Sequence, residues 1–150
     1  PGNKRLFASV NGWRIHLQVC YDLRFPIWAR QRSTYDEDGN FHPEYDVLIY
    51  VANWPERRSE AWKTLLRARA IENQCYVVGV NRIGVDGHGI NHSGDSMIIS
   101  PIGDILHHSA DRNELHTLTL DPVMLQETRE RLPFLRDADG FMILSDELPE

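Results

Sequence analysis

The sequence predicts an α/β fold built around a strand–helix–strand unit. Residues 47–51 and 76–80 are near-continuous apolar runs, the pattern of strands covered on both faces. Between them, residues 59–73 carry apolar side chains at helical spacing, and Ser59 is a suitable N-cap. The apolar residues at that spacing are Trp62, Leu65, Leu66, Ala70 and Ile71. Because such a crossover joins parallel strands, we expect a mostly parallel sheet.

Two further strands are predicted near the start of the chain. They cover residues 6–10 and 14–20, and the second alternates polar and apolar side chains. Asn11-Gly12 between them is a hairpin turn signal. The polar stretch 33–45, which contains Asp, Gly, Asn and Pro, is expected to form a surface loop.

The second half of the chain predicts shorter strands and one helix. We expect strands at 96–100, 104–108 and 115–120, separated by turn sequences. Pro122 opens a helix that runs to about Arg131. Residues from about 133 to 150 contain two prolines and several acids, and we expect them to form a C-terminal arm that reaches a partner subunit.

Composition narrows the class of protein. The 150 residues, 41% of them hydrophobic, suit one globular domain or most of one. A formal charge of −6 argues against nucleic acid as a partner. No apolar run approaches the roughly 20 residues that cross a bilayer, so we expect no membrane partner and a cytoplasmic location. Two cysteines are too few for a disulfide framework, which agrees with a reduced compartment.

Cys20 is the candidate nucleophile. It stands at the end of a predicted strand and before a polar turn, and α/β sheets present their ligands at that carboxyl edge. The backbone N–H of Tyr21 could then stabilise negative charge on the oxygen of an attacked carbonyl. By strand position alone, a small buried apolar residue is the better interpretation of Cys20.

Four ordered motifs decide between these interpretations. They are Val-Cys-Tyr-Asp-Leu-Arg-Phe-Pro at 19–26, Tyr-Val-Ala-Asn-Trp-Pro at 50–55, Arg-Ala-Ile-Glu-Asn at 69–73 and Gly-Asp-Ser at 94–96. From about Gly12 to Phe141 the chain resembles the nitrilase superfamily of carbon–nitrogen hydrolases, and within it the ω-amidase branch. The resemblance implies a four-layer αββα sandwich, of which this chain is the C-terminal, larger part.

The resemblance also implies a catalytic mechanism. Members use a Cys nucleophile, a Glu general base and a Lys that stabilises the tetrahedral intermediate, and Cys20 matches the first. The Glu and Lys precede the Cys motif in the family, and neither Lys4 nor Arg5 has the matching context. A thiol with an ordinary pKa needs such neighbours, so we expect this stretch to be inactive alone and more protein to lie upstream of Pro1.

The resemblance implies a small-molecule amide substrate, an ω-amide of a short dicarboxylic acid such as 2-oxoglutaramate or 2-oxosuccinamate. It implies no cofactor and no metal, and a homodimer or larger even homo-oligomer. Two alternatives stay open: a superfamily enzyme for nitriles, N-carbamoyl compounds or peptide-like amides, and a degenerate binding or scaffold protein.

Three further residues are candidates for substrate binding. Asn53 and Trp54 follow a buried strand and should reach the same sheet edge as Cys20, with Trp54 as a pocket wall or as ordinary loop packing. Arg24 could hold a substrate carboxylate or pair with a buried acid, and we favour the pairing. Asp22 could bind backbone N–H groups or Arg24, or be solvated.

Structural roles are expected for several other residues. The family resemblance implies that Glu72 anchors the helix to the sheet, and Cys75 is expected to pack in the core. His88 and His92 have the four-residue spacing of a zinc helix, but the surrounding glycines predict a loop from Gly84 to Gly94 instead. We expect that loop to border the site.

Overall fold

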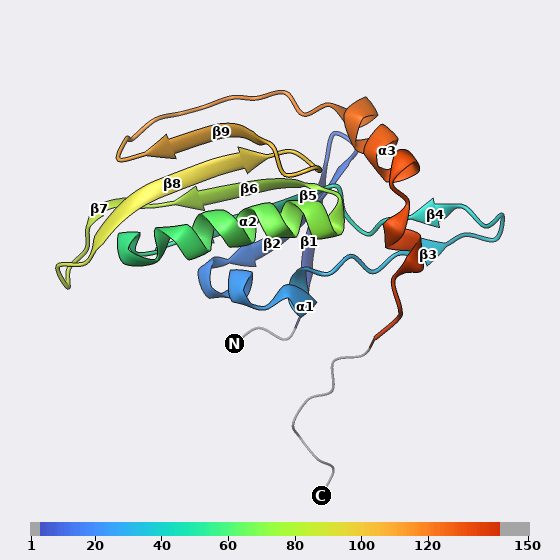
Figure 1. The fold of residues 1–150 in the computed structure, drawn as a ribbon, viewed down its shortest axis with the longest axis horizontal. Helices are drawn as coiled ribbons and strands as arrows, with labels where there is room; N and C mark the ends of the chain where they lie inside the picture. The colour runs from blue at the N-terminus through green and yellow to red at the C-terminus, as the bar shows by residue number, and fades with distance from the viewer. Residues whose placement is uncertain (1–3, 142–150) are drawn as a thin grey trace, which may run out of the picture.

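The computed structural model describes residues 4–141, which form a seven-stranded mixed sheet, a separate two-stranded sheet and three α-helices (Figure 1). The strands are β1 (Leu6–Val10), β2 (Trp13–Val19), β3 (Thr34–Tyr35), β4 (Phe41–His42), β5 (Val47–Ala52), β6 (Tyr76–Asn81), β7 (Ile83–Val85), β8 (Asn91–Ile99) and β9 (Ile105–Ala110). The α-helices are α1 (Pro26–Ala29), α2 (Ser59–Asn73) and α3 (Pro122–Arg131). Short 3₁₀ helices are η1 (Cys20–Arg24), η2 (Glu56–Arg58) and η3 (Phe134–Asp137).

The main sheet has the strand order β1-β2-β5-β6-β8-β9, and β7 pairs with the first residues of β8. The predicted β5-α2-β6 crossover is confirmed, with β5 and β6 parallel. The prediction of a mostly parallel sheet is wrong. Only the β2–β5 and β5–β6 pairs are parallel, because β1, β7, β8 and β9 are all joined to their neighbours by hairpins.

Helix α2 lies across one face of the sheet and makes the main core (Figure 1). The side chains of Trp62 and Leu66 are fully buried there against Leu48, Tyr50 and Val77. Gly79 on β6 allows this close approach, because a Cβ built on it would lie 2.5 Å from a methyl of Leu66. The predicted helix bounds are confirmed.

The opposite face of the sheet is covered only in part by the described residues. Helix α3 packs Leu125 against Val47 and Tyr76 at the amino ends of the parallel strands. Toward the carboxyl ends, Val51 and Val80 are each 49% exposed. Apart from α3 at that end, the described residues thus supply one helical layer and one sheet, which is half of an αββα sandwich, and apolar side chains lie on the uncovered part of the outer face.

Three local predictions are corrected. Residues 115–120 form no ladder with any described strand, and Leu115 is 96% exposed, so the predicted strand has no pairing partner among the described residues. Ser59 is not an N-cap: its N–H bonds to the carbonyl of Glu56 in η2, which leads directly into α2, and the N-cap Arg58 makes no side-chain cap. The 33–45 loop contains the β3–β4 hairpin.

The predicted loop from Gly84 to Gly94 is a hairpin in the structure. Strands β7 and β8 pair from Ile83↔Ser93 to Val85↔Asn91, and only the tip lies outside the ladder. Asp86 accepts the N–H groups of His88 (2.8 Å) and Ile90 (3.0 Å), which closes that tip. The hairpin projects past the end of β6, at the left of Figure 1. Among residues 4–141, no helix is long and apolar enough to span a membrane.

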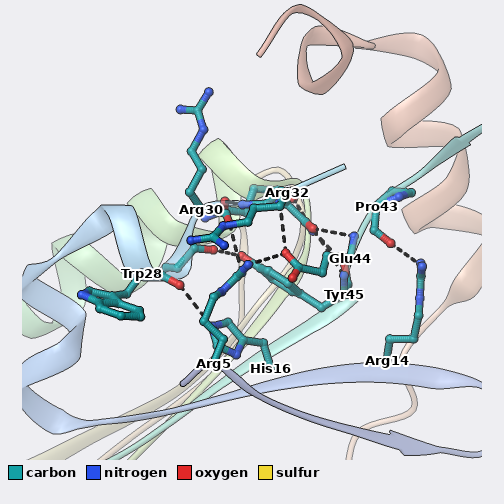
Figure 2. A network of polar contacts seen from close by, with 12 residues as sticks. Arg5, Arg14, His16, Trp28, Arg30, Arg32, Pro43, Glu44 and Tyr45 are labelled. Carbon is teal, nitrogen blue, oxygen red and sulfur yellow. Dashed lines mark hydrogen bonds and ion pairs between the residues drawn. The ribbon is translucent and has the colours of Figure 1, made fainter. Parts of the chain in front are cut away.

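A polar network ties the segment between α1 and β5 to the first two strands (Figure 2). The Arg5 guanidinium donates to the Glu44 carboxylate and, at 3.0 Å, to the carbonyl of Arg30. The His16 ring lies 3.0 Å from the carbonyl oxygen of Leu6 and 3.2 Å from that of Trp28. These contacts hold β1 and the α1 region together beside η1.

Candidate active site

Cys20 follows β2 at the carboxyl edge of the parallel strands, as predicted, and begins the 3₁₀ helix η1. Its φ of +45° lies in the left-handed region that non-glycine residues rarely adopt. Such backbone strain persists only where neighbours hold it, and it is concentrated at functional sites. The side chain is half-buried, so the thiol is neither locked in the core nor fully solvated.

Asp22 stabilises the turn that begins at Cys20. Its carboxylate accepts the N–H of Val19 at 2.9 Å, and its carbonyl accepts the N–H of Phe25 at 3.0 Å. Of the three roles left open for Asp22, the structure shows the contact with a backbone N–H group. Tyr21 is the second residue of η1, and its backbone N–H has no acceptor inside that helix.

Arg69 on α2 stabilises the same turn. This buried side chain of α2 donates to the carbonyl of Leu23 at 2.7 Å and pairs with Glu72 at 3.0 Å. A guanidinium at the C-terminal carbonyls of a helical turn is favourable both as a donor and for its charge. Glu72 therefore anchors α2 to η1 through Arg69, rather than to the sheet as predicted. The sequence motif did not single out Arg69, although a charge on the apolar stripe of a helix was a usable signal.

The three candidate substrate-binding residues lie around the end of β5. Trp54 is 3% exposed, and its ring packs 5.6 Å from that of Trp62 in the core. The Arg24 guanidinium stacks over the Trp54 ring at 4.7 Å. Among residues 4–141 no carboxylate pairs with Arg24, so the favoured buried acid is not found there. Asn53 is exposed beside them.

Two cavities differ in whether their polar groups are already hydrogen-bonded within the described residues. A cavity of about 410 Å³ borders η1 and is lined in part by Arg5, Gln18, Tyr21 and Asp22. The Gln18 carboxamide oxygen is buried and has no hydrogen-bond partner within the described residues.

A larger cavity of about 620 Å³ lies at the other edge of the sheet, beside α3. Its Arg14 and Arg129 donate to the carboxylate of Asp46 (2.8 Å each) and to backbone carbonyls. Those contacts use the guanidinium donors, so this cluster joins α3 to the strands.

The remaining candidates are structural. Burial raises the pKa of the Cys75 thiol well above its usual range, which agrees with a packing role. His92 is buried, with one ring nitrogen 3.0 Å from the carbonyl of Ile90, and Asp86 is occupied by its own turn. Within residues 4–141, no group of three or more His, Cys, Asp or Glu side chains is placed to hold a metal ion.

Comparison with known proteins gives the family. The fold and the Cys20 turn define an α/β protein with a thiol at the carboxyl edge of its sheet. The model of the carbon-nitrogen hydrolase family matches residues 1–130. The chain belongs to the carbon–nitrogen hydrolase family. The family predicted from the four motifs is confirmed.

Individual relatives refine the match. The chain is 45% identical over 144 residues to "Omega-amidase YafV" of Escherichia coli strain K12, which covers 95% of this chain and 52% of that protein. It is 34% identical over 136 residues to "2-oxoglutaramate amidase" of Bacillus subtilis strain 168, covering 91% and 49%. The crystal structure of XC1258 from Xanthomonas campestris, described as a CN-hydrolase superfamily protein with an arsenic adduct in the active site, has a TM-score of 0.89. That protein is 44% identical, with 95% of this chain and 53% of that chain covered. The chain spans about half the length of the curated relatives it matches.

Proposed function

We propose that the full-length natural protein, meaning this chain with whatever its gene encodes around it, hydrolyses the carbon–nitrogen bond of short ω-amides. The observation that carries the proposal is Cys20 in the left-handed conformation at the carboxyl edge of the sheet. Its turn is stabilised by the hydrogen bonds of Asp22 to Val19 and of Arg69 to Leu23. The relatives named as ω-amidase and 2-oxoglutaramate amidase support the substrate class. Substrates of the 2-oxoglutaramate and 2-oxosuccinamate type follow from this.

The mechanism uses a thioester. The Cys20 thiolate attacks the amide carbonyl carbon, and the Tyr21 N–H donates to the oxygen on which negative charge develops. The tetrahedral intermediate collapses, the C–N bond breaks, and the nitrogen leaves as ammonia after taking a proton. Water then attacks the thioester, which gives the carboxylic acid and regenerates the thiol. By family resemblance, a Glu base and a Lys come from the part of the relatives' length that this chain does not cover.

Arg24 gives the substrate preference. Its guanidinium is exposed, stacks on Trp54 and has no carboxylate partner among residues 4–141. A planar guanidinium binds a carboxylate with two parallel hydrogen bonds, so it suits the distal carboxylate of an ω-amide. Trp54 is the platform on which Arg24 rests, and the exposed Asn53 amide beside it contacts the substrate.

The cellular setting is proposed from the sequence. Residues 1–150 form part of a carbon–nitrogen hydrolase domain, and residues 133–150 form an arm between subunits of a homodimer or larger even assembly. Of that arm, residues 142–150 lie outside the described part of the chain. The partner is a small-molecule amide, with no nucleic acid and no membrane, and the location is the cytoplasm. The net charge of −6 supports the exclusion of nucleic acid.

The test is ammonia release from 2-oxoglutaramate and 2-oxosuccinamate by the full-length natural protein. Cys20→Ala should abolish turnover, and Cys75→Ala, which removes the other thiol, should retain it. Turnover that survives in Cys20→Ala would refute the thioester mechanism. If neither amide is hydrolysed by the unaltered protein, the ω-amide proposal fails, and nitriles or N-carbamoyl compounds become the substrates to try.

A second arm tests the carboxylate contact. Arg24→Met should raise the KM for 2-oxoglutaramate by about tenfold or more, because a hydrogen-bonded charge contact is lost. Arg131→Met on α3, at the other edge of the sheet, is the matched control and should leave KM unchanged. Equal KM values in both variants would remove Arg24 from the substrate site.

A further inference from the structure

One buried amide holds the main chain at the end of β5. Asn81 is the last residue of β6 and is 8% exposed. Its side-chain oxygen accepts the N–H of Trp54 at 2.7 Å, and its side-chain nitrogen donates to the carbonyl of Trp54 at 3.0 Å. The same nitrogen donates to the carbonyl of Gly94 at 2.7 Å. Both amide protons and the amide oxygen are therefore in use.

These bonds replace the strand ladder where the ladder stops. The β5–β6 pairing ends at Ala52↔Asn81, so the next residues of the chain have no strand neighbour on that side. Asn81 bonds both backbone groups of Trp54, and it joins them to Gly94 at the irregularity of β8. The path of the chain through Asn53 is thereby fixed at the sheet edge where Cys20 lies.

Trp54 carries this constraint to the proposed substrate site. Its indole N–H donates to the carbonyl of Arg58 at 2.7 Å, and its ring is buried against Trp62. The exposed Arg24 guanidinium rests on that ring at 4.7 Å. Arg24 has no ion-pair partner in the part of the chain that the structure describes, so the indole plane is the contact that sets where its charge lies.

We propose that Asn81 is a positioning residue that sets carboxylate recognition through Trp54 and Arg24. The inference rests on the proposed function and names a determinant of its specificity. Asn81 touches no reacting atom. Its amide holds the Trp54 backbone, the indole supports the guanidinium, and the guanidinium meets the distal carboxylate of the substrate.

The chemistry of the contact requires an amide. An aspartate at position 81 would keep the shape and accept the N–H of Trp54. Its second oxygen, however, would face the carbonyl oxygens of Trp54 and Gly94, where acceptor meets acceptor without a proton. Asn81→Asp should therefore shift the Trp54 turn with little change in side-chain volume. Asn81→Ser removes the same contacts without adding charge, and serves if the aspartate variant does not fold.

The test measures kcat and KM of the full-length natural protein for 2-oxoglutaramate and for a neutral amide of equal length. Asn81→Asp should raise KM for the acidic substrate on the order of tenfold, as Arg24→Met does, with kcat and the KM for the neutral amide nearly unchanged. Asn113→Asp, an exposed change of the same kind, is the matched control. In the Arg24→Met background, Asn81→Asp should have no further effect on KM.

Two outcomes would overturn the proposal. One is a loss of kcat or of folded protein with KM unchanged, which is what a merely structural Asn81 would give. The other is that the effects of Asn81→Asp and Arg24→Met on KM multiply, which would mean that the two residues act independently.

A readout that needs no amidase turnover separates this proposal from the proposed function. Cys20 should react faster with anionic iodoacetate, relative to neutral iodoacetamide, when Arg24 is in place. Asn81→Asp and Arg24→Met should lower that rate ratio equally. If the unaltered protein hydrolyses no ω-amide but the ratio falls in both variants, only the proposed function fails. If the ratio falls in Arg24→Met alone, Asn81 has no positioning role.

Discussion

Gly79 should be a sensitive position in the core. A Cβ at this residue of β6 would lie 2.5 Å from Leu66 Cδ1 and 2.9 Å from Trp62 Cζ2. Both neighbours are fully buried on α2, so neither can move aside without disturbing the core. Overpacking of this kind costs about 1–3 kcal/mol, and the reduced freedom of the unfolded chain returns about 0.4–1 kcal/mol. We expect Gly79→Ala to lower the free energy of unfolding by about 1–2 kcal/mol.

The assay is equilibrium unfolding of the full-length natural protein in urea, with the midpoint and slope compared between variants. Gly87→Ala is the matched control, because a Cβ there meets nothing within 4 Å. It should be neutral or slightly stabilising. If Gly79→Ala and Gly87→Ala have the same midpoint, the close approach of α2 to β6 does not limit stability and the reasoning is refuted.

Three further predictions follow from buried titratable groups. At pH 7–8, iodoacetamide should alkylate Cys20 in the folded protein and leave Cys75 unmodified, since burial raises the pKa of the Cys75 thiol; equal labelling in peptide mass spectra would contradict this. Burial lowers the pKa of His16 below its usual 6.5, so the unfolded state binds more protons than the folded state below about pH 6.5. The free energy of unfolding therefore falls as the pH drops through 6.5. The urea midpoint should fall further between pH 7.5 and about 5.5 in the unaltered protein than in His16→Asn. Burial alone would raise the pKa of Asp46, but hydrogen bonds from two guanidinium groups outweigh it and hold the pKa below 3.8. Its contribution is therefore present above that pH and lost as the pH falls through the lowered value, and the stability gap between the unaltered protein and Asp46→Asn should narrow between pH 7 and pH 3 in the same unfolding assay.

Local patterns determined the elements of the fold. The β5-α2-β6 unit, the first hairpin and α3 were all predicted, because side-chain periodicity and turn residues act within a few positions of the chain. The same patterns did not show that β8 pairs antiparallel with β6, and they predicted a strand at 115–120 where the described residues supply no partner. A strand needs a hydrogen-bonded neighbour, and the position of that neighbour is decided by the tertiary structure.

The site divides in the same way. The sequence by itself predicted the place of Cys20 at the end of β2, because the signal lies within one short motif, but it left the role of Asp22 open. Only the tertiary structure decided that Arg69 holds Leu23 across 46 positions and that Asn81 holds Trp54 across 27. Packing of α2 on the sheet and the parallel register of β5 and β6 bring those groups together, and no periodicity in the sequence encodes such contacts.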